Sequence, residues 1–204
     1  IVLFFVCRYK KIPFLAFADL GGMGLLIGQC IGRWGNFVNV EAYGGLTELP
    51  WRMCSEKIAN ELYAKGLVDA AGWQQVVDGT LGVHPTFFYE SAWNLVGFLL
   101  IVFISRNWRK FDGQLFFTYL AWYGVGRGII EGMRTDSLYF MNTPIRVSQV
   151  LGFASALAAI ILWVWFYLHR PAPDQLWVHR RAALEAAKAA NEKKEDEDNG
   201  SDHH

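Results

Sequence analysis

The stretch that decides the fold is VSQVLGFASALAAIILWVWFYL, residues 147–168, which contains no charged side chain. At a rise of about 1.5 Å per residue, a helix of this length crosses the roughly 30 Å hydrocarbon core of a bilayer. Backbone groups inside a bilayer need hydrogen-bond partners within their own segment, which a helix provides. The sequence therefore predicts a membrane-spanning helix over 147–168.

Further apolar runs lie upstream of this helix. They cover residues 1–7, 13–31, 87–104 and 114–130. The run at 13–31 is rich in glycine, which permits close contact between helices in membranes, and we interpret 1–7 as the end of a cut helix. We therefore expect an all-α polytopic membrane protein, a helical bundle of about five spans whose first span is cut.

Lys and Arg residues gather in alternate connections between these runs. The clusters are Arg8/Lys10/Lys11, Arg106/Arg109/Lys110 and Arg170/Arg180/Arg181. Because cytoplasmic loops carry an excess of Lys and Arg, we expect these connections in the cytoplasm and the stretches 34–84 and 131–146 outside. The formal net charge is +0, so no overall basicity indicates a nucleic-acid partner.

The polar parts of the chain predict two further units. Glycine turn signals within 34–84 predict a small external cap over about residues 37–83. Residues 169–204 become polar and end in an acidic run, a composition typical of a disordered tail, here cytoplasmic. We expect residues 1–168 to form one transmembrane domain.

Some charged residues lie in or beside the apolar runs, where a charge costs on the order of 3 kcal/mol and usually faces a cavity or a partner. They are Arg33, Glu90 and the trio Arg127, Glu131 and Arg134. The trio stands at i, i+4 and i+7, which predicts one helical stripe. Its carboxylate can hold one arginine while the other binds an external anion, since a guanidinium fork matches phosphate oxygens. The alternative is an ion-pair ladder with snorkelling side chains.

Two further segments combine unusual residues. In GRWGNFVNVEAYGG, residues 32–45, the glycines permit tight turns at the membrane surface, and Arg33 and Asn36 can present a charge and an amide together. A helix exit anchored by Arg and Trp is the alternative. His84 precedes Pro85, which suits a first helical turn; this histidine could shuttle a proton or serve structure alone.

Three motifs resemble elements of the prolipoprotein diacylglyceryl transferase family. Residues 32–44 resemble its signature Gly-Arg-x-Gly-Asn-Phe-x-Asn-x-Glu-x-x-Gly. HPTFFYE, residues 84–90, resembles its His-Pro-x-x-x-Tyr-Glu element, and GRGIIEGMRTD, residues 126–136, resembles its late Arg-x-x-x-Glu-x-x-Arg-x-Asp element. The family's His-Gly-Gly-Leu element has no counterpart here, and a full member is expected to have about seven spans.

The resemblance implies transfer of the sn-1,2-diacylglyceryl group from phosphatidylglycerol to the lipobox cysteine of prolipoproteins, forming a thioether and leaving glycerol 1-phosphate. The implied partners are phosphatidylglycerol, prolipoprotein signal peptides with a lipobox Cys and the lipid bilayer, with the site at the external face of the bacterial cell membrane. Residues 1–168 are then the catalytic domain. The implied catalytic residues are Arg127, Glu131 and His84. The implied phosphatidylglycerol-binding residues are Arg33, Asn36, Glu41, Gly44, Tyr89, Glu90 and Arg134.

The chemistry implied needs a base, because a thiol with a pKa of about 8.5 is mostly protonated at neutral pH. His84, Glu131 or a histidine upstream of Ile1 could serve. We expect no cofactor and no metal, since no aspartate pair or His/Glu cluster has ligand spacing and the three cysteines are widely separated. The alternative function is an anion or lipid-headgroup transporter, because intramembrane arginines also mark substrate pathways.

Overall fold

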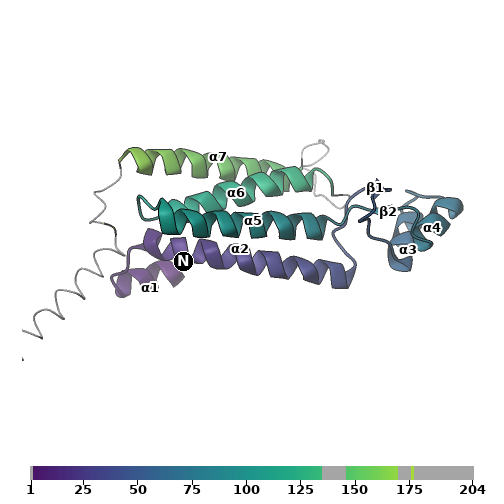
Figure 1. Ribbon diagram of the computed structural model, residues 1–204, viewed down its shortest axis with the longest axis horizontal. Coiled ribbons are helices and arrows are strands. Elements are labelled where there is room, and N and C mark those ends of the chain that lie inside the picture. Colours follow the sequence, from purple (N-terminus) through teal and green to yellow (C-terminus); the bar gives the residue numbers. More distant parts are fainter. Residues whose placement is uncertain (1, 135–145, 170–175, 177–204) are drawn as a thin grey trace, which may run out of the picture.

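The computed structural model describes residues 2–134, 146–169 and 176. Its long helices form an elongated bundle with a small cap at one end (Figure 1). The bundle consists of α1 (Val2–Tyr9), α2 (Phe14–Asn39), α5 (Thr86–Asn107), α6 (Gln114–Glu131) and α7 (Val147–Leu168). Of the helices described, α2, α5 and α7 are long and apolar enough to cross a membrane. The expected all-α polytopic membrane fold is confirmed.

α6 is the inner helix of the bundle. It packs against α2, α5 and α7 and buries polar side chains at both ends, Gln114 and Glu131. A helix enclosed by protein can carry polar groups, because its neighbours rather than lipid surround them. This enclosure explains why α6 is less apolar than the three helices around it.

Two facing glycines allow α6 and α7 to approach each other closely. A Cβ added at Gly124 would lie 2.5 Å from the carbonyl oxygen of Gly152, and one added at Gly152 would lie 2.8 Å from that of Gly124. Small residues allow membrane helices to pack backbone against backbone. This contact sets Arg127, one turn beyond Gly124, against α7.

A reciprocal tryptophan contact joins α5 to α6. The rings of Trp93 and Trp122 stack with centroids 4.4 Å apart. Each indole Nε1 donates to the backbone carbonyl of the other tryptophan, at 3.0 and 2.8 Å. Trp93 fills the space over Gly126, and Trp122 fills the space over Gly97. The contact fixes the register of the two helices within about one turn of Glu90 and Arg127.

α2 is longer than the sequence predicted. It continues past Ile31 to Asn39, so the expected tight turns at the glycines of residues 32–35 are wrong. Contacts with α5 sustain the extra turns: Trp34 Nε1 donates to Ser91 Oγ at 3.1 Å, and Arg33 pairs with Glu90. The chain turns just afterwards, where Val40 and Ala42 have φ values of 53° and 55°.

The cap lies between α2 and α5. Strand β1 (Leu46–Thr47) pairs antiparallel with β2 (Gly82–Val83), and the helices α3 (Glu56–Ala64) and α4 (Ala70–Val77) complete it. Ser55 and Asp69 cap the two helices by accepting the amide protons of Ile58 and Gly72. A small apolar core holds the cap together, including Tyr43, Ile58, Leu62, Val76 and Val83.

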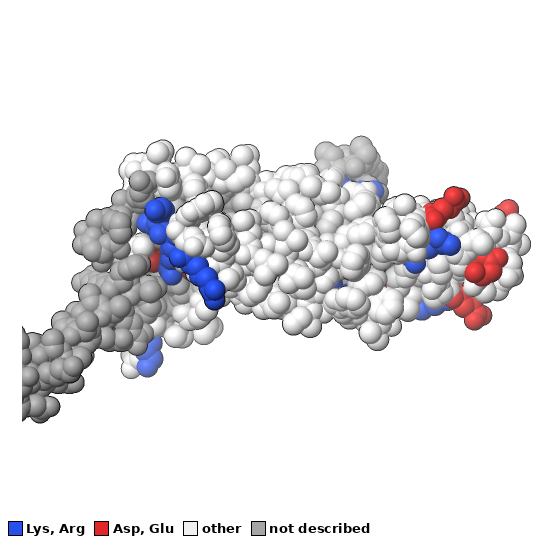
Figure 2. Space-filling view, viewed as in Figure 1, with Lys and Arg blue, Asp and Glu red and all other residues white. Residues whose placement is uncertain are grey.

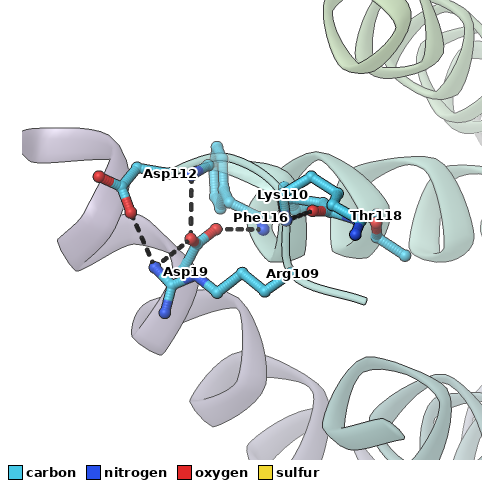
Figure 3. Close-up of polar contacts among 8 residues, drawn as sticks. Asp19, Arg109, Lys110, Asp112, Phe116 and Thr118 are labelled. Carbon is cyan, nitrogen blue, oxygen red and sulfur yellow. Dashed lines mark hydrogen bonds and ion pairs between the residues drawn. The ribbon is translucent and has the colours of Figure 1, made fainter. Parts of the chain in front are cut away.

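Charged side chains lie toward the two ends of the molecule, and the face shown in Figure 2 is uncharged in between. At the end opposite the cap, Asp19 of α2 is 2% exposed and accepts the amide protons of Gly113 and Phe116, each at 2.9 Å (Figure 3). Arg109 lies 3.0 Å from both Asp19 and Asp112. This cluster ties the α5–α6 connection to α2.

The charge of Asp19 inside an apolar run was not among those singled out from the sequence. This end also carries Arg8 and Arg106. Its location in the cytoplasm stays a prediction. Of the tail predicted at 169–204, only His169 and Leu176 are among the described residues. The predicted basic residues Arg170, Arg180 and Arg181 lie outside them. The side chain of Leu176 is buried.

Candidate functional site

Three helices bring four charged side chains together near the cap. Arg33 of α2 lies 2.7 Å from Glu90 of α5 (Nη2 to Oε2), and Arg127 of α6 lies 3.6 Å from the other oxygen of Glu90 (Nη1 to Oε1). Arg127 also pairs with Glu131, one turn further along α6, at 2.8 Å (Nη2 to Oε2). All four had been predicted as site residues, and we call them the arginine cluster.

The carboxylates of this cluster are more deeply buried than its guanidinium groups. Glu90 and Glu131 are 4% and 2% exposed, whereas the side chains of Arg33 and Arg127 are each 20% exposed. Opposite charges interact strongly where water is excluded. Glu90 therefore separates two positive groups and orients both.

The arginine cluster retains unused hydrogen-bonding capacity. A guanidinium group offers five N–H donors. Arg127 Nη1 and Glu90 Oε1 are buried without a hydrogen-bond partner among the described residues. Arg127 also lines an open groove of about 400 Å³ between α6 and α7, together with Tyr123, Gly124, Ser148, Leu151, Gly152 and Ser155.

The entry to the cap, its exit and the end of α6 meet at Gly44. The Gly44 amide donates to the His84 carbonyl at 2.9 Å, and the Gly45 amide donates to that of Met133 at 3.2 Å. A Cβ at Gly44 would lie 2.8 Å from that of His84, so only glycine fits. Gly44 also forms an isolated bridge with Arg134.

His84 belongs to a hydrogen-bonded row that reaches the cap. Its Nδ1 lies 3.1 Å from the hydroxyl of Tyr89, which accepts the Nε1 proton of Trp51 at 2.9 Å. The indole can only donate. The Tyr89 hydroxyl can therefore either donate to His84 or accept from it. Trp51 was not singled out from the sequence.

Two further predicted residues, Asn36 and Glu41, lie outside the arginine cluster. Asn36 is half-buried in the last turns of α2, and Glu41 is exposed and accepts from Asn39 Nδ2 at 3.2 Å. No hydrogen bond or ion pair joins Asn36 or Glu41 to the arginine cluster in the part of the chain that the structure describes.

The predicted stripe of Arg127, Glu131 and Arg134 is wrong in its last member. α6 ends at Glu131, and Gly132 caps it, so Arg134 lies past the helix and its backbone meets Gly44 instead. Glu131 holds Arg127, which answers the question that the sequence left open of which arginine of the trio pairs with the carboxylate. The motif residue Asp136 lies outside the described residues.

Within residues 2–134 and 146–169 no group of three His, Cys, Asp or Glu side chains could hold a metal ion. Cys7, Cys30 and Cys54 are free thiols. Cys30 Sγ lies 3.3 Å from Ser91 Oγ, between α2 and α5. Ser91, Trp93 and Trp122 support the site without having been predicted, although the Trp-x-x-x-Gly spacing that starts at each tryptophan was visible in the sequence.

Comparison with known proteins points to one family. The family model described as prolipoprotein diacylglyceryl transferase matches residues 1–165. The chain is 45% identical over 159 residues to the phosphatidylglycerol-prolipoprotein diacylglyceryl transferase of Lysinibacillus sphaericus (strain C3-41), covering 76% of this chain and 54% of that protein. It is 38% identical over 164 residues to the transferase of the same name from Finegoldia magna, covering 80% and 56% respectively.

The chain spans about half the length of the curated relatives that it matches. Their names favour the transferase over the transporter hypothesis. The matched segment contains all three motifs and the whole arginine cluster. The chain belongs to the prolipoprotein diacylglyceryl transferase family.

Proposed function

We propose that the complete protein transfers the sn-1,2-diacylglyceryl group of phosphatidylglycerol to the lipobox cysteine of prolipoproteins. The observation that carries this proposal is the arginine cluster, in which Arg33 and Arg127 from separate helices flank one buried carboxylate. The names of the relatives supply the substrates. The described residues supply a reason why an anionic lipid binds here.

Arg33 and Arg127 bind the phosphate of the lipid. Each guanidinium group uses only part of its five donors on carboxylates, and a planar fork can bind two phosphate oxygens at once. Glu90 and Glu131 do not touch the phosphate, because like charges repel; they hold the guanidinium planes in position. In this proposal Glu90, which the family resemblance assigned to lipid binding, is a positioning residue.

The reaction forms one bond and breaks one. The cysteine sulfur attacks the carbon of the diacylglyceryl group that is bonded to the phosphate oxygen. A C–S bond forms at this carbon, and its C–O bond breaks with the electron pair on the leaving glycerol 1-phosphate. The negative charge that develops on this oxygen is stabilised by Arg33 and Arg127 in a site from which water is largely excluded. The thiol proton goes to a base, for which the described residues offer His84 and Glu131.

The groove between α6 and α7 fits a lipid substrate. It combines Arg127 with the apolar side chain of Leu151 and the small residues Gly152 and Ser155. A lipid whose phosphate is held at Arg127 can thus lay its acyl chains along the apolar helix surface. Such division between a few polar groups and an apolar lining is typical of ligand sites.

We place the site at the external face of the bacterial cell membrane and the opposite end of the bundle in the cytoplasm. The support is the basic connection with Arg106, Arg109 and Lys110, at the end away from the cap. A Trp108→Cys variant, with Cys7, Cys30 and Cys54 replaced, should react with a membrane-impermeant maleimide only after cells are opened. Reaction in intact cells would reverse the orientation.

The activity is tested with the complete protein in vesicles of phosphatidylglycerol labelled in its acyl chains. A lipobox peptide should gain the label through a thioether bond, and the same peptide with serine in place of the cysteine should gain none. Absence of any labelled product from folded, membrane-inserted protein would overturn the proposed function.

A further inference from the structure

Each helix that contributes to the arginine cluster carries a second polar side chain one turn deeper in the bundle. The pairs are Arg33 with Gln29 on α2, Glu90 with Asn94 on α5, and Arg127 with Tyr123 on α6. Residues four apart share a helix face and are separated by roughly 6 Å along the axis. Since α2 and α6 run toward the cap and α5 runs away from it, all three second residues lie on the inner side (Figure 1).

The side-chain amide of Asn94 is buried, and its N–H donor is unpaired among the described residues. The residue is 2% exposed, and its Nδ2 has no hydrogen-bond partner among the described residues. A buried N–H donor left unpaired is costly, and such groups in native proteins call for an explanation. The unused donor of Asn94 points to a ligand atom that accepts a hydrogen bond.

Gln29 presents a second amide at the same depth. Its Nε2 donates to the Tyr119 hydroxyl at 3.2 Å, and its Oε1 is buried without a partner among the described residues. If the amide turns by 180°, Tyr119 donates to the oxygen and the nitrogen becomes the unused donor. Two amides thus lie one turn below the charges, on neighbouring helices that are in contact at Cys30 and Ser91.

We propose that Asn94, assisted by Gln29, binds the ester carbonyl oxygens of the diacylglyceryl group while the arginine cluster holds the phosphate. This inference rests on the proposed function and deepens it. In a glycerophospholipid the ester carbonyls follow the phosphate by the few bonds of the glycerol backbone, a reach comparable with one helical turn of roughly 6 Å. The two layers of side chains thus match the order of polar groups along the substrate.

The contact makes the enzyme selective for diester lipids. An ester carbonyl accepts a hydrogen bond from an amide N–H, whereas a dialkyl ether of the same length has no carbonyl. Sites that hydrogen-bond a substrate group reject analogues that lack it, because the buried protein group is then left unpaired. Asn94 is therefore a specificity-determining residue.

A purely structural role for these amides makes a different prediction. If Asn94 and Gln29 only bind each other across α2 and α5, replacing either residue changes stability and slows all lipid substrates alike. Only a direct contact with the substrate changes the ratio between diester and diether lipids.

The experiment compares phosphatidylglycerol with its di-O-alkyl ether analogue of equal chain length, using the complete protein and a lipobox peptide. The wild-type rate with the diester should exceed the diether rate by roughly fivefold to tenfold, the effect of one good hydrogen bond. Asn94→Leu should lower the diester rate and leave the diether rate nearly unchanged, so that the ratio approaches one. Asn107→Leu, at the exposed end of the same helix away from the cap, is the matched control and should keep the wild-type ratio.

Each outcome bears on the inference separately from the activity. Equal wild-type rates with both lipids overturn the inference without any variant, and so does an Asn94→Leu protein that keeps the full ratio or loses both rates equally. If Asn94→Leu does not accumulate, Asn94→Ala, which removes the amide donor without adding bulk, is expected to lower the ratio. A wild-type protein inactive with the diester contradicts the proposed function itself.

Discussion

The two ends of the bundle use the same kinds of residues in different ways. At the end away from the cap, both carboxylate oxygens of Asp19 accept backbone amide protons, and Arg109 adds an ion pair. At the capped end, Glu90 Oε1 and Arg127 Nη1 are buried but accept and donate no hydrogen bond among the described residues. Arg109 Nε is also buried without a hydrogen-bond partner among the described residues, so the two ends differ in their carboxylates. Both oxygens of Asp19 are used within the fold, whereas Glu90 leaves one oxygen beside an arginine that lines an open groove.

Arg→Lys substitutions should give the largest difference between the two ends of the bundle. Lysine keeps the charge and loses the planar fork, so Arg33→Lys or Arg127→Lys should lower turnover roughly a hundredfold, a loss of about 2.7 kcal/mol in the transition state. The measurement is transfer of labelled diacylglyceryl to a lipobox peptide by the complete protein.

Arg109→Lys is the matched control at the other end. It should reduce stability and leave the rate per folded molecule near that of the wild type. Near-normal rates for both Arg33→Lys and Arg127→Lys would return these residues to a purely anchoring role.

Asp19→Asn tests the end that serves the fold. The amide group keeps one acceptor oxygen but loses the charge that strengthens three contacts, so the free energy of unfolding should fall by about 1.5–3 kcal/mol. Unfolding is measured in detergent, and turnover per folded molecule should be unchanged. Glu48→Gln, an exposed acid of the cap, should change neither quantity; a large activity loss in a stable Asp19→Asn protein contradicts the comparison.

The tryptophan contact between α5 and α6 should show how far the arginine cluster depends on helix register. Trp93→Phe removes the indole donor to Trp122 and leaves space over Gly126. We expect a stability loss of about 1 kcal/mol for the hydrogen bond, together with a smaller fall in turnover than for the arginine variants. Phe103→Leu, on the exposed lipid-facing side of α5, is the control. Turnover that falls as far as in Arg127→Lys would assign Trp93 a direct role in the reaction.

The smallest effect is expected in the cap. Lys65, 2.6 Å from Glu61, and the Tyr43 hydroxyl lower the pKa of Glu61 below its ordinary value of 4.5. Because the folded state has the lower pKa, this stabilisation is present above the ordinary value and is lost as the pH falls through the folded pKa. For an exposed pair it amounts to only about 0.3–0.5 kcal/mol.

Glu61→Gln should therefore be slightly less stable than the wild type at neutral pH, and the difference should vanish well below pH 4.5. Denaturant unfolding at a series of pH values measures it. Lys65→Met should reproduce the neutral-pH loss, and a difference that grows in acid would show that the sign is wrong.

Residue spacing predicted the parts of the molecule in which one segment decides its own structure. The uncharged run 147–168 is α7, and the charges of Arg33, Glu90 and Arg127 were recognised because lipid tolerates them poorly. The family motifs pointed to the same residues. Spacing could not show that Glu90 lies between the two arginines, because that depends on the packing of three helices.

The errors have the same origin. α2 extends to Asn39 because α5 supplies partners for Trp34 and Arg33, a tertiary effect that overrides the local turn signal of the glycines. Asp19 was passed over because its partners, the amides of Gly113 and Phe116, are more than ninety residues away. The roles of Asn36 and Glu41 depend on contacts that spacing does not specify, and they stay predictions.

The way in which the cap joins the bundle has an evolutionary consequence. The chain enters the cap near Gly44 and leaves it at His84, and these residues are hydrogen-bonded to each other, as are His84 and Gly45. The insert therefore begins and ends at one point, so lengthening or shortening it leaves the helices in place, and the entropy of closing a loop grows only slowly with its length. The exposed turn at Gly66, between α3 and α4, is therefore a position where residues can be inserted or removed without rebuilding the membrane domain.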